Sequence, residues 1–469
     1  MSPLFLFPHA RSLRSFKPSP GRPSRENSIL RTYFQRDTTV TVVHQSPYDR
    51  HISLSRHCAL ALAASLSCAA LQLSSVSAAQ SKAGNWAQCE GPDPDLSIAA
   101  CTTLIQSGKE DTENNAVAFN SRGIAYDIKG QHDQAITDFN QAIQLEPEYA
   151  GAFSNRANAY AAEGLFDKAM ADYNTAIRLK PDDAGAFNYR GVAFAMIGQF
   201  DRAVADFDQA IKLKPDDAGA FNNRGSAYDG KGQYDRAIAD FGEAIELKPD
   251  YAEAFSNRGN AYTDSHKFDL AIADYTEAIK LNPLDAATFY NRGVTYLAKG
   301  QADRAIADFN EATRLRPNQA EAFNQRGVAR HNKGQDDQAV SDFDEAIRIK
   351  PDFAEAYKNR CLSRAIAGDP QSAIEDCNQA LTLRPNDSPS IGIRGFANLK
   401  AMYPVAAIAD FNNSLAANPK DASSLYGRGV AKQYAGDAAG AAEDIGAAKR
   451  LQSDIAVKFS RWGVTAKPD

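Results

Sequence analysis

Two charged side chains recur along this sequence at a fixed separation. An arginine is followed sixteen residues later by an aspartate, and the pair occurs ten times at intervals of 34 residues. A guanidinium in such a row could hold an anionic ligand, or it could bond the carboxylate of the aspartate. The arginines are Arg122, Arg156, Arg190, Arg224, Arg258, Arg292, Arg326, Arg360, Arg394 and Arg428. The aspartates are Asp138, Asp172, Asp206, Asp240, Asp274, Asp308, Asp342, Asp376, Asp410 and Asp444.

Residues suited to catalysis or metal binding are sparse outside this pair. Beyond residue 80 the histidines are His132, His266 and His331, which fall in different repeats without the spacing of paired metal ligands. The sequence contains no C-x-x-C and no G-x-S-x-G motif. The GKG at 230–232 follows a predicted helix, so we expect a turn rather than a phosphate-binding loop. We therefore expect no enzyme activity, no metal and no cofactor.

The 34-residue period sets the elements that carry the Arg–Asp pair. Counting each unit from 31 residues before a recurring proline gives ten units, which begin at 116, 150, 184, 218, 252, 286, 320, 354, 388 and 422. Apolar residues recur at helical spacing in two runs per unit, separated by a break such as Gly232. The pattern predicts helix-turn-helix units that stack, because one helix pair has no core of its own.

Small and aromatic positions predict how the helices of a unit pack. The eighth position is mostly glycine, the twentieth is always alanine, and the twenty-fourth is aromatic in eight units. Because the two helices run antiparallel, positions seven and twenty-three should lie at similar heights. We therefore expect ion pairs such as Arg224–Asp240 and Arg258–Asp274, within a unit or between neighbours. A ladder of arginines holding an anionic ligand is the alternative.

Two of the six cysteines, Cys58 and Cys68, lie in residues 56–79, a predicted signal peptide, and four remain in the mature chain. In unit eight, Cys361 replaces the small eighth residue and Cys377 the aromatic twenty-fourth, so the two should face each other. Cys89 and Cys101 lie just before the first unit. An even number of cysteines in an exported chain predicts two disulfides, Cys89–Cys101 and Cys361–Cys377, with buried free thiols as the alternative.

The unit resembles the tetratricopeptide repeat. The resemblance rests on a small residue at position eight, Ala at twenty and twenty-seven, an aromatic at twenty-four and Pro at thirty-two. It covers 116–455, and the NRG…DF pattern is similar to that of exported bacterial members. The family's frequent Trp at position four is Phe here. The resemblance implies an all-α, right-handed superhelical solenoid of ten helix-turn-helix units with terminal caps, whose first helices line a concave groove.

The groove residues predict which ligand it takes. The cationic clamp of some family members is missing, because position five carries a single cation, Lys358. Position six instead carries a row of asparagines, similar to the ladder in the tetratricopeptide arm of a glycosyltransferase. Amides can bond the backbone of an extended peptide whatever its sequence, although they could equally bond a neighbouring turn. The candidate groove residues are Asn155, Asn223, Asn257, Asn291 and Asn359.

The N-terminal region differs from the repeats. Residues 1–55 are expected to be disordered, as an over-extended gene model or an organelle transit peptide. Residues 56–79 combine a basic start, an apolar run and a small-residue end, which predicts a cleaved signal peptide rather than a buried helix or an anchor. Residues 80–115 should form an N-terminal cap.

The C-terminal end is also expected to form a cap. Residues 456–469 form the predicted cap and tail after the tenth unit. Apolar side chains around its start should shield the last repeat, as the open end of a solenoid requires. They are Ile455, Val457, Phe459 and Trp462.

Net charge and the predicted signal peptide limit which functions are expected. The whole chain carries −6, and its first 79 residues hold nine basic against three acidic residues, so the body is acidic. An acidic body argues against binding nucleic acid. We expect a periplasmic or secreted scaffold for a protein or peptide, without a membrane span in the mature chain. Alternatives are an organelle-targeted protein, and a structural spacer or assembly factor of an envelope or polysaccharide-export complex.

Overall fold

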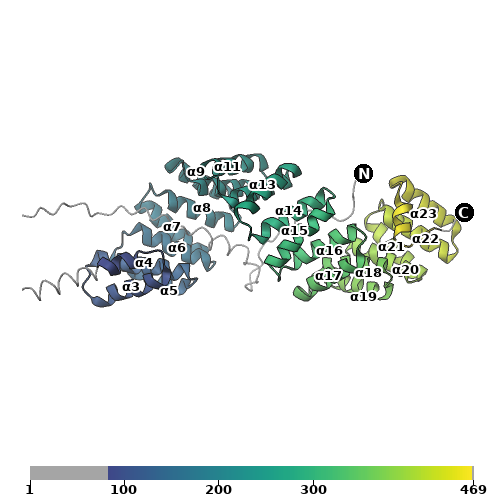
Figure 1. Cartoon of the computed structure of the whole chain (residues 1–469), viewed down its shortest axis with the longest axis horizontal. Helices are drawn as coiled ribbons and strands as arrows, with labels where there is room; N and C mark the ends of the chain where they lie inside the picture. The colour runs from purple at the N-terminus through teal and green to yellow at the C-terminus, as the bar shows by residue number, and fades with distance from the viewer. Residues whose placement is uncertain (1–82, 467–469) are drawn as a thin grey trace, which may run out of the picture. The chain divides into compact units, whose positions relative to one another are not determined.

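The computed structural model describes residues 83–466, and this part of the chain contains helices but no strand. The predicted extension at 1–55 and signal peptide at 56–79 lie outside the described residues. The helices form hairpins that follow one another along the chain (Figure 1). Contacts divide the chain at residue 249 into an N-terminal unit and a C-terminal unit, which are described separately.

The described part of the N-terminal unit begins with a helical stretch at 83–89 and the helix α3, which are followed by repeats 1–4, each made of a first and a second helix. Its helices are α3 (Pro94–Ser107), α4 (Thr112–Ile128), α5 (His132–Leu145), α6 (Ala150–Ala162), α7 (Phe166–Leu179), α8 (Ala184–Met196), α9 (Phe200–Leu213), α10 (Ala218–Gly230) and α11 (Tyr234–Leu247).

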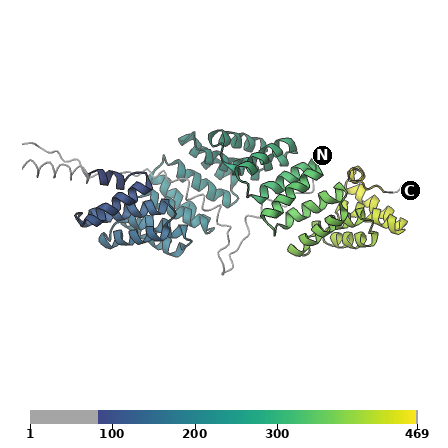
Figure 2. The ribbon, with the colours of Figure 1, turned by 60° about the horizontal axis from the view of Figure 1, so that its bottom comes forward.

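The C-terminal unit contains repeats 5–10 and a short last helix. Its helices are α12 (Ala252–Asp264), α13 (Phe268–Leu281), α14 (Ala286–Ala298), α15 (Ala302–Leu315), α16 (Ala320–Asn332), α17 (Asp336–Ile349), α18 (Ala354–Ala367), α19 (Pro370–Leu383), α20 (Ser388–Lys400), α21 (Pro404–Ala417), α22 (Ala422–Ala435), α23 (Ala438–Leu451) and α24 (Ile455–Arg461). The turned view in Figure 2 shows the same sequence of hairpins.

Sequence features account for where the helices begin and end. First helices in several repeats begin after an aspartate whose side chain accepts from backbone N–H groups, as Asp217 does in repeat 4. The turn between the two helices needs a left-handed residue, which is Gly232 in that repeat, with φ of 74°. In repeats 5 and 9 His266 and Met402 take this conformation instead. The predicted all-α repeat solenoid is therefore confirmed.

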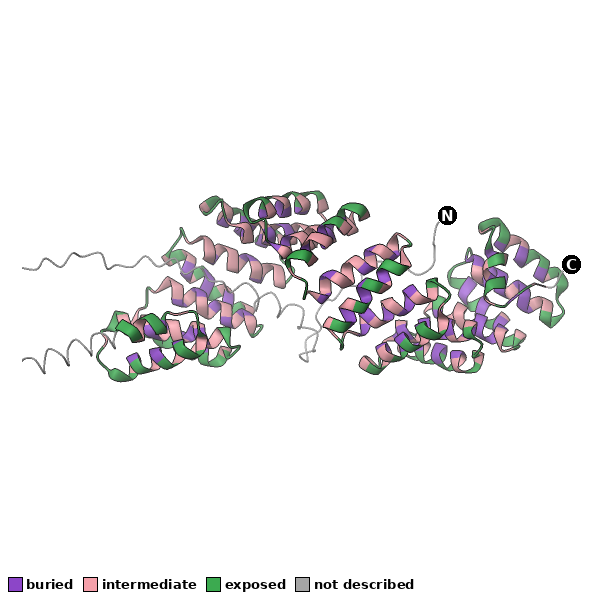
Figure 3. Cartoon of the chain, in the orientation of Figure 1, coloured by how far each residue is buried: buried purple, intermediate pink, exposed green. Residues whose placement is uncertain are grey.

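The core consists of aromatic rings held between small residues. The Phe241 ring is 1% exposed and lies so close to Gly225 that an added Cβ there would be 2.8 Å from it. In repeat 3 the equivalent ring, Phe207, also packs against Ala227 of the next repeat. Buried residues accordingly lie where helices meet (Figure 3). Stacking of repeats thus buries each ring between two neighbours, as the sequence predicts.

Successive repeats pack mainly through the second helix of one repeat and the first helix of the next, and their first helices also meet. Within each unit, the first helices of neighbouring repeats contact one another, whereas the described second helices of neighbouring repeats make few contacts or none. The first helices therefore lie on the inner side of each unit's curve. We call the surface formed by these first helices the inner face.

The two ends carry partial repeats. The helix α3 takes the place of a second helix before repeat 1, with Cys101 fully buried at the aromatic position. At the other end, Ile455 and Phe459 are buried against repeats 9 and 10 and Trp462 packs beside them. Val457 is 54% exposed, so its predicted role in shielding the last repeat was wrong.

Candidate functional site

The Arg–Asp pair joins the two helices of one repeat. In repeat 4, Arg224 Nη2 lies 2.7 Å from Asp240 Oδ1, and its Nε lies 2.8 Å from Oδ2. This is a bidentate pair, and Asp240 is only 6% exposed. Asp274 pairs with Arg258 in the same way, at 2.7 Å. Of the two arrangements that the sequence left open, the pairing is within a repeat.

The same arginines also connect neighbouring repeats. Arg224 Nη1 donates to Asp208 Oδ1 of the preceding repeat at 2.7 Å. The acceptor stands at position twenty-five of its repeat, on the second helix. This position was not singled out from the sequence. The acceptors along the two units are Thr102, Asn140, Asn174, Asp208, Thr276, Asn310, Asp344, Asn378 and Asn412.

These contacts occupy most of the Arg224 guanidinium. The Arg224 side chain also lies over the Phe221 ring, 5.4 Å from its centroid. The hydrogen bond to Asp240 raises the pKa of Arg224 above its ordinary value, although partial burial opposes the shift. Three of its nitrogens already donate within the protein, which leaves little for an anionic ligand. The geometry favours a structural role for the arginine row.

Repeats 7–10 reinforce the pair with a residue at position eleven. Arg330 Nη1 lies 2.8 Å from Asp342 Oδ2, and Arg364 Nη1 lies 2.9 Å from Asp376 Oδ2. Asn398 and Lys432 bond the aspartates of repeats 9 and 10 from the same position. In repeats 1–6 position eleven is aromatic. This difference between early and late repeats was not predicted from the sequence.

The asparagine row lies on first helices, where it bonds the neighbouring repeat. The Nδ2 atoms of Asn155 and Asn223 donate to side-chain oxygens of the preceding repeat, at 3.0 and 3.1 Å. Asn291 does the same at 2.9 Å. These three and Asn257 are half-buried. Asn359 is 5% exposed and donates to Asn324, which makes it the least accessible of the five candidates.

The partners of three of these asparagines have a signal in the sequence. The acceptors Asn120, Asn188 and Asn324 each stand 35 residues before their donor. They occupy position five, next to the row that the sequence analysis selected. An asparagine at five followed by one at six in the next repeat could therefore have identified the pairs.

Two carboxylates lie near Tyr290 on the first helices of repeats 7 and 8. Burial, followed by the charges of Glu321 and Glu355, raises the pKa of Tyr290 to about 12, while a hydrogen bond with Gln325 opposes the shift. All four residues belong to the first helices α14, α16 and α18. Glu321 is also paired with Lys350 at 3.3 Å.

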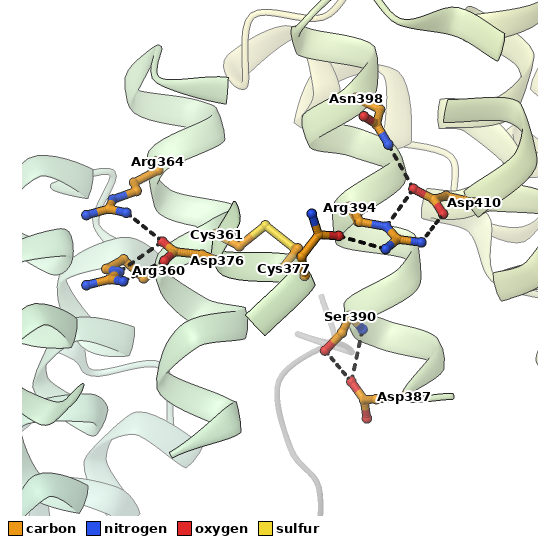
Figure 4. Close-up of a disulfide and its surroundings, with 11 residues drawn as sticks. Arg360, Cys361, Arg364, Asp376, Cys377, Asp387, Ser390, Arg394, Asn398 and Asp410 are labelled. Atoms are coloured by element: carbon orange, nitrogen blue, oxygen red, sulfur yellow. Dashed lines mark hydrogen bonds and ion pairs between the residues drawn. A yellow bond between two sulfur atoms is a disulfide. The ribbon is translucent and has the colours of Figure 1, made fainter. Parts of the chain in front are cut away.

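Both predicted cysteine pairs lie at bonding distance. The sulfurs are 2.02 Å apart in Cys89–Cys101 and 2.08 Å apart in Cys361–Cys377. The second pair joins α18 to α19, one residue along from the Arg360–Asp376 ion pair on both helices (Figure 4). Cys361 and Cys377 are both fully buried, so the bridge occupies the core of repeat 8.

Other kinds of site find no support in the part of the chain that the structure describes. Between residues 83 and 466 no group of His, Cys, Asp and Glu side chains could hold a metal ion. None of the described helices combines the length and apolar character needed to cross a bilayer. The half-exposed amides of the inner face are the candidate functional residues.

Comparison with known families identifies the repeat. Sequence models described as TPR repeat match 123–164, 157–198, 195–232 and 230–265. Models described as Tetratricopeptide repeat match 256–320 and 320–353. A search of curated proteins gave no match.

Solved structures with similar architecture cover part of the chain. YrrB, described as a TPR protein with an unusual peptide-binding site, is 26% identical over 39% of this chain and 95% of its own, with a TM-score of 0.34. PilF of Pseudomonas aeruginosa is 17% identical over 45% of this chain and 97% of its own, with a TM-score of 0.41. PilW, a type IV pilus biogenesis factor, is 20% identical over 44% of this chain and 96% of its own, with a TM-score of 0.42.

Proposed function

The chain belongs to the tetratricopeptide repeat family, whose models match residues 123–353, and on this premise we propose that it is a non-enzymatic scaffold of the cell envelope. Its ligand is an extended segment of a partner protein. The segment lies along the inner face, where it meets the first helices of successive repeats.

The amide row of the inner face carries this proposal. An amide offers two N–H donors and a carbonyl acceptor. The bonds between neighbouring repeats use one N–H of Asn155, Asn223 and Asn291, and these side chains remain half-exposed. Amides of this kind can bond the backbone of an extended chain whatever its sequence. Asn257 and Asn359 continue the same row.

The charge of the inner face narrows the partner's chemistry. Glu321 and Glu355 lie near Tyr290 on first helices of the C-terminal unit. A partner segment crossing this region would meet negative charge, so neutral or basic segments are favoured over acidic ones. The acidic body of the chain supports the same preference.

Export to an oxidising compartment is the part of the proposal that concerns location. The two cysteine pairs at bonding distance support it, because disulfides persist in secreted and periplasmic proteins and are rare in the cytosol. Mass spectrometry of the mature N-terminus tests it. A start near Ala79 or Gln80 is expected, and a mature chain that retains 56–79 would contradict cleavage.

Partner capture tests the role of the amide row. The variant with Asn223, Asn257, Asn291 and Asn359 all changed to Ala should lose the proteins that the wild type captures from an envelope extract. Helical circular dichroism and the melting temperature should change little, because three of the four side chains are half-exposed and only Asn359 is buried.

A matched control separates the inner face from the other surfaces. Gln134→Ala, Gln379→Ala and Asn413→Ala together remove three exposed amides from second helices. This control should keep full capture. Capture that survives the inner-face changes but fails in the control would place the site on the second helices and favour a spacer or assembly role.

A further inference from the structure

The last helix of the chain is the beginning of an eleventh repeat that stops early. Counting onward by 34 from 422, Phe459 takes position four and Gly463 position eight of a unit that begins at 456. The helix α24 ends at Arg461, after seven residues. Gly463 then adopts a φ of 75°, and the chain continues without helix to Ala466. A seven-residue helix is not stable alone, so tertiary contacts must hold it.

Those contacts are aromatic and lie on two repeats. The Phe459 ring is 4.8 Å from that of Tyr426 in repeat 10 and 5.7 Å from that of Phe396 in repeat 9. The Trp462 ring lies 5.4 Å from Phe396. Phe396 and Tyr426 belong to the first helices α20 and α22, so the segment covers the inner face of repeats 9 and 10. Shielding the last repeat alone would not need contacts with repeat 9.

The segment is also held through its backbone. Lys400 Nζ donates to the carbonyl oxygen of Trp462 at 3.0 Å. The backbone of Ala466 lies beside the phenol of Tyr426, where it opposes the rise in the phenol's pKa that burial causes. Bonds to the backbone do not depend on the side chains of the segment, whereas the aromatic contacts do. Together they resemble the way in which a peptide is held in a groove.

The inner face changes character in these two repeats. Position nine is Phe396 in repeat 9, where earlier repeats carry Ile, Val, Leu, Asn or Ser. Position six is Ile393 and then Gly427, so the asparagine row ends. The aromatic surface begins where the amide surface stops, and the chain's own segment is seated on it.

We propose that the inner face of repeats 9 and 10 is a second peptide-binding subsite, which residues 459–466 occupy in the free protein. Its ligand is a partner segment with two aromatic side chains three residues apart, matching Phe459 and Trp462, and this segment displaces the chain's own. The proposal rests on the proposed peptide-binding function and extends it to a different part of the inner face.

A labelled peptide with the sequence of residues 455–466 tests the subsite. Fluorescence anisotropy should show at least about tenfold tighter binding to the full chain carrying Phe459→Ala and Trp462→Ala than to the wild type, because the subsite is vacated. Adding Phe396→Ala to that variant should abolish binding. Equal affinity for the wild type and the double variant, or no binding to either, would overturn the proposal.

A second measurement uses the protein with its own segment intact. The chain has two tryptophans, so Trp86→Phe leaves Trp462 as the reporter. An excess of the same peptide, with phenylalanine replacing its tryptophan, should shift Trp462 emission to longer wavelength as the segment leaves. If Trp462 emission does not shift at saturating peptide, displacement is contradicted. A dimer seen by light scattering would also contradict it, because two copies would then be exchanging their segments.

The two proposals can fail separately. The inner-face asparagine variant should still respond to the peptide as the wild type does, because its changes lie outside repeats 9 and 10. A peptide response without partner capture would leave the subsite standing while the amide row fails. Partner capture without a peptide response would leave the amide row standing while the subsite fails.

Discussion

Repeats 7 and 8 are neighbours with matching ion pairs, but the space between their two helices is filled differently. In repeat 7 the Phe343 ring lies against Gly327, where an added Cβ would be 2.6 Å from it. In repeat 8 the same two positions carry the bonded pair Cys361–Cys377. One repeat joins its helices by a buried ring and the other by a covalent bridge, so their stabilities should respond to different treatments.

Removing the ring should have the largest effect. Phe343→Ala leaves a cavity at a fully buried site and should destabilise repeat 7 by about 3–5 kcal/mol. Hydrogen exchange of peptides from α16 and α17 measures the local free energy of opening. Peptides from α23, distant in the stack, serve as the control. A loss below about 1 kcal/mol would mean that the ring is not what holds this helix pair together.

The ion pair is the feature that both repeats share, and it is tested most cleanly in repeat 4. There position eleven is Tyr228, so no second cation bonds the aspartate. Arg224→Ala should cost roughly 3–5 kcal/mol, because Asp240 is left buried without its partner. Asp240→Ala should also destabilise the repeat but by less, because Arg224 keeps its bond to Asp208. The double variant should cost less than the sum. Strict additivity in this double-mutant cycle would contradict the pairing.

Breaking the bridge should affect repeat 8 and spare repeat 7. A disulfide that closes a loop of this length stabilises the fold by about 3 kcal/mol. Reduction should therefore speed hydrogen exchange in α18 and α19 but leave hydrogen exchange in α16 unchanged. The mature chain, denatured before reduction, should show no reactive thiol. Four free thiols would refute both bridges.

Converting one core into the other should have the smallest effect. Cys361→Gly with Cys377→Phe gives repeat 8 the residues of repeat 7. The stability should stay within about 1.5 kcal/mol of the oxidised wild type, since the ring replaces the bridge in the same space. Reductant should then no longer change exchange in α18 and α19. A repeat that stays sensitive to reductant would owe that sensitivity to Cys89–Cys101.

The sequence predicted the features that are fixed within one repeat. The helix-turn-helix unit, the pairing of Arg224 with Asp240 and the facing of Cys361 and Cys377 all follow from the spacing of residues on two antiparallel helices. Each is decided by local geometry, which the 34-residue pattern repeats ten times.

Features that depend on how repeats stack were harder to foresee. The bond from Arg224 to Asp208 crosses to the preceding repeat, and the bond from Asn223 to Asn188 does likewise. Both depend on the offset between repeats, which a single repeat does not reveal. The return of Trp462 to Phe396 was also missed, because it depends on α24 ending early rather than on any pattern in the repeats.

Hydrogen exchange with and without a captured partner tests the central claim, that a partner binds along the inner face. The account predicts slower exchange on binding in the first helices α10, α12, α14 and α18, with the second helices α11, α13, α15 and α19 little changed. Slower exchange confined to those second helices would contradict it.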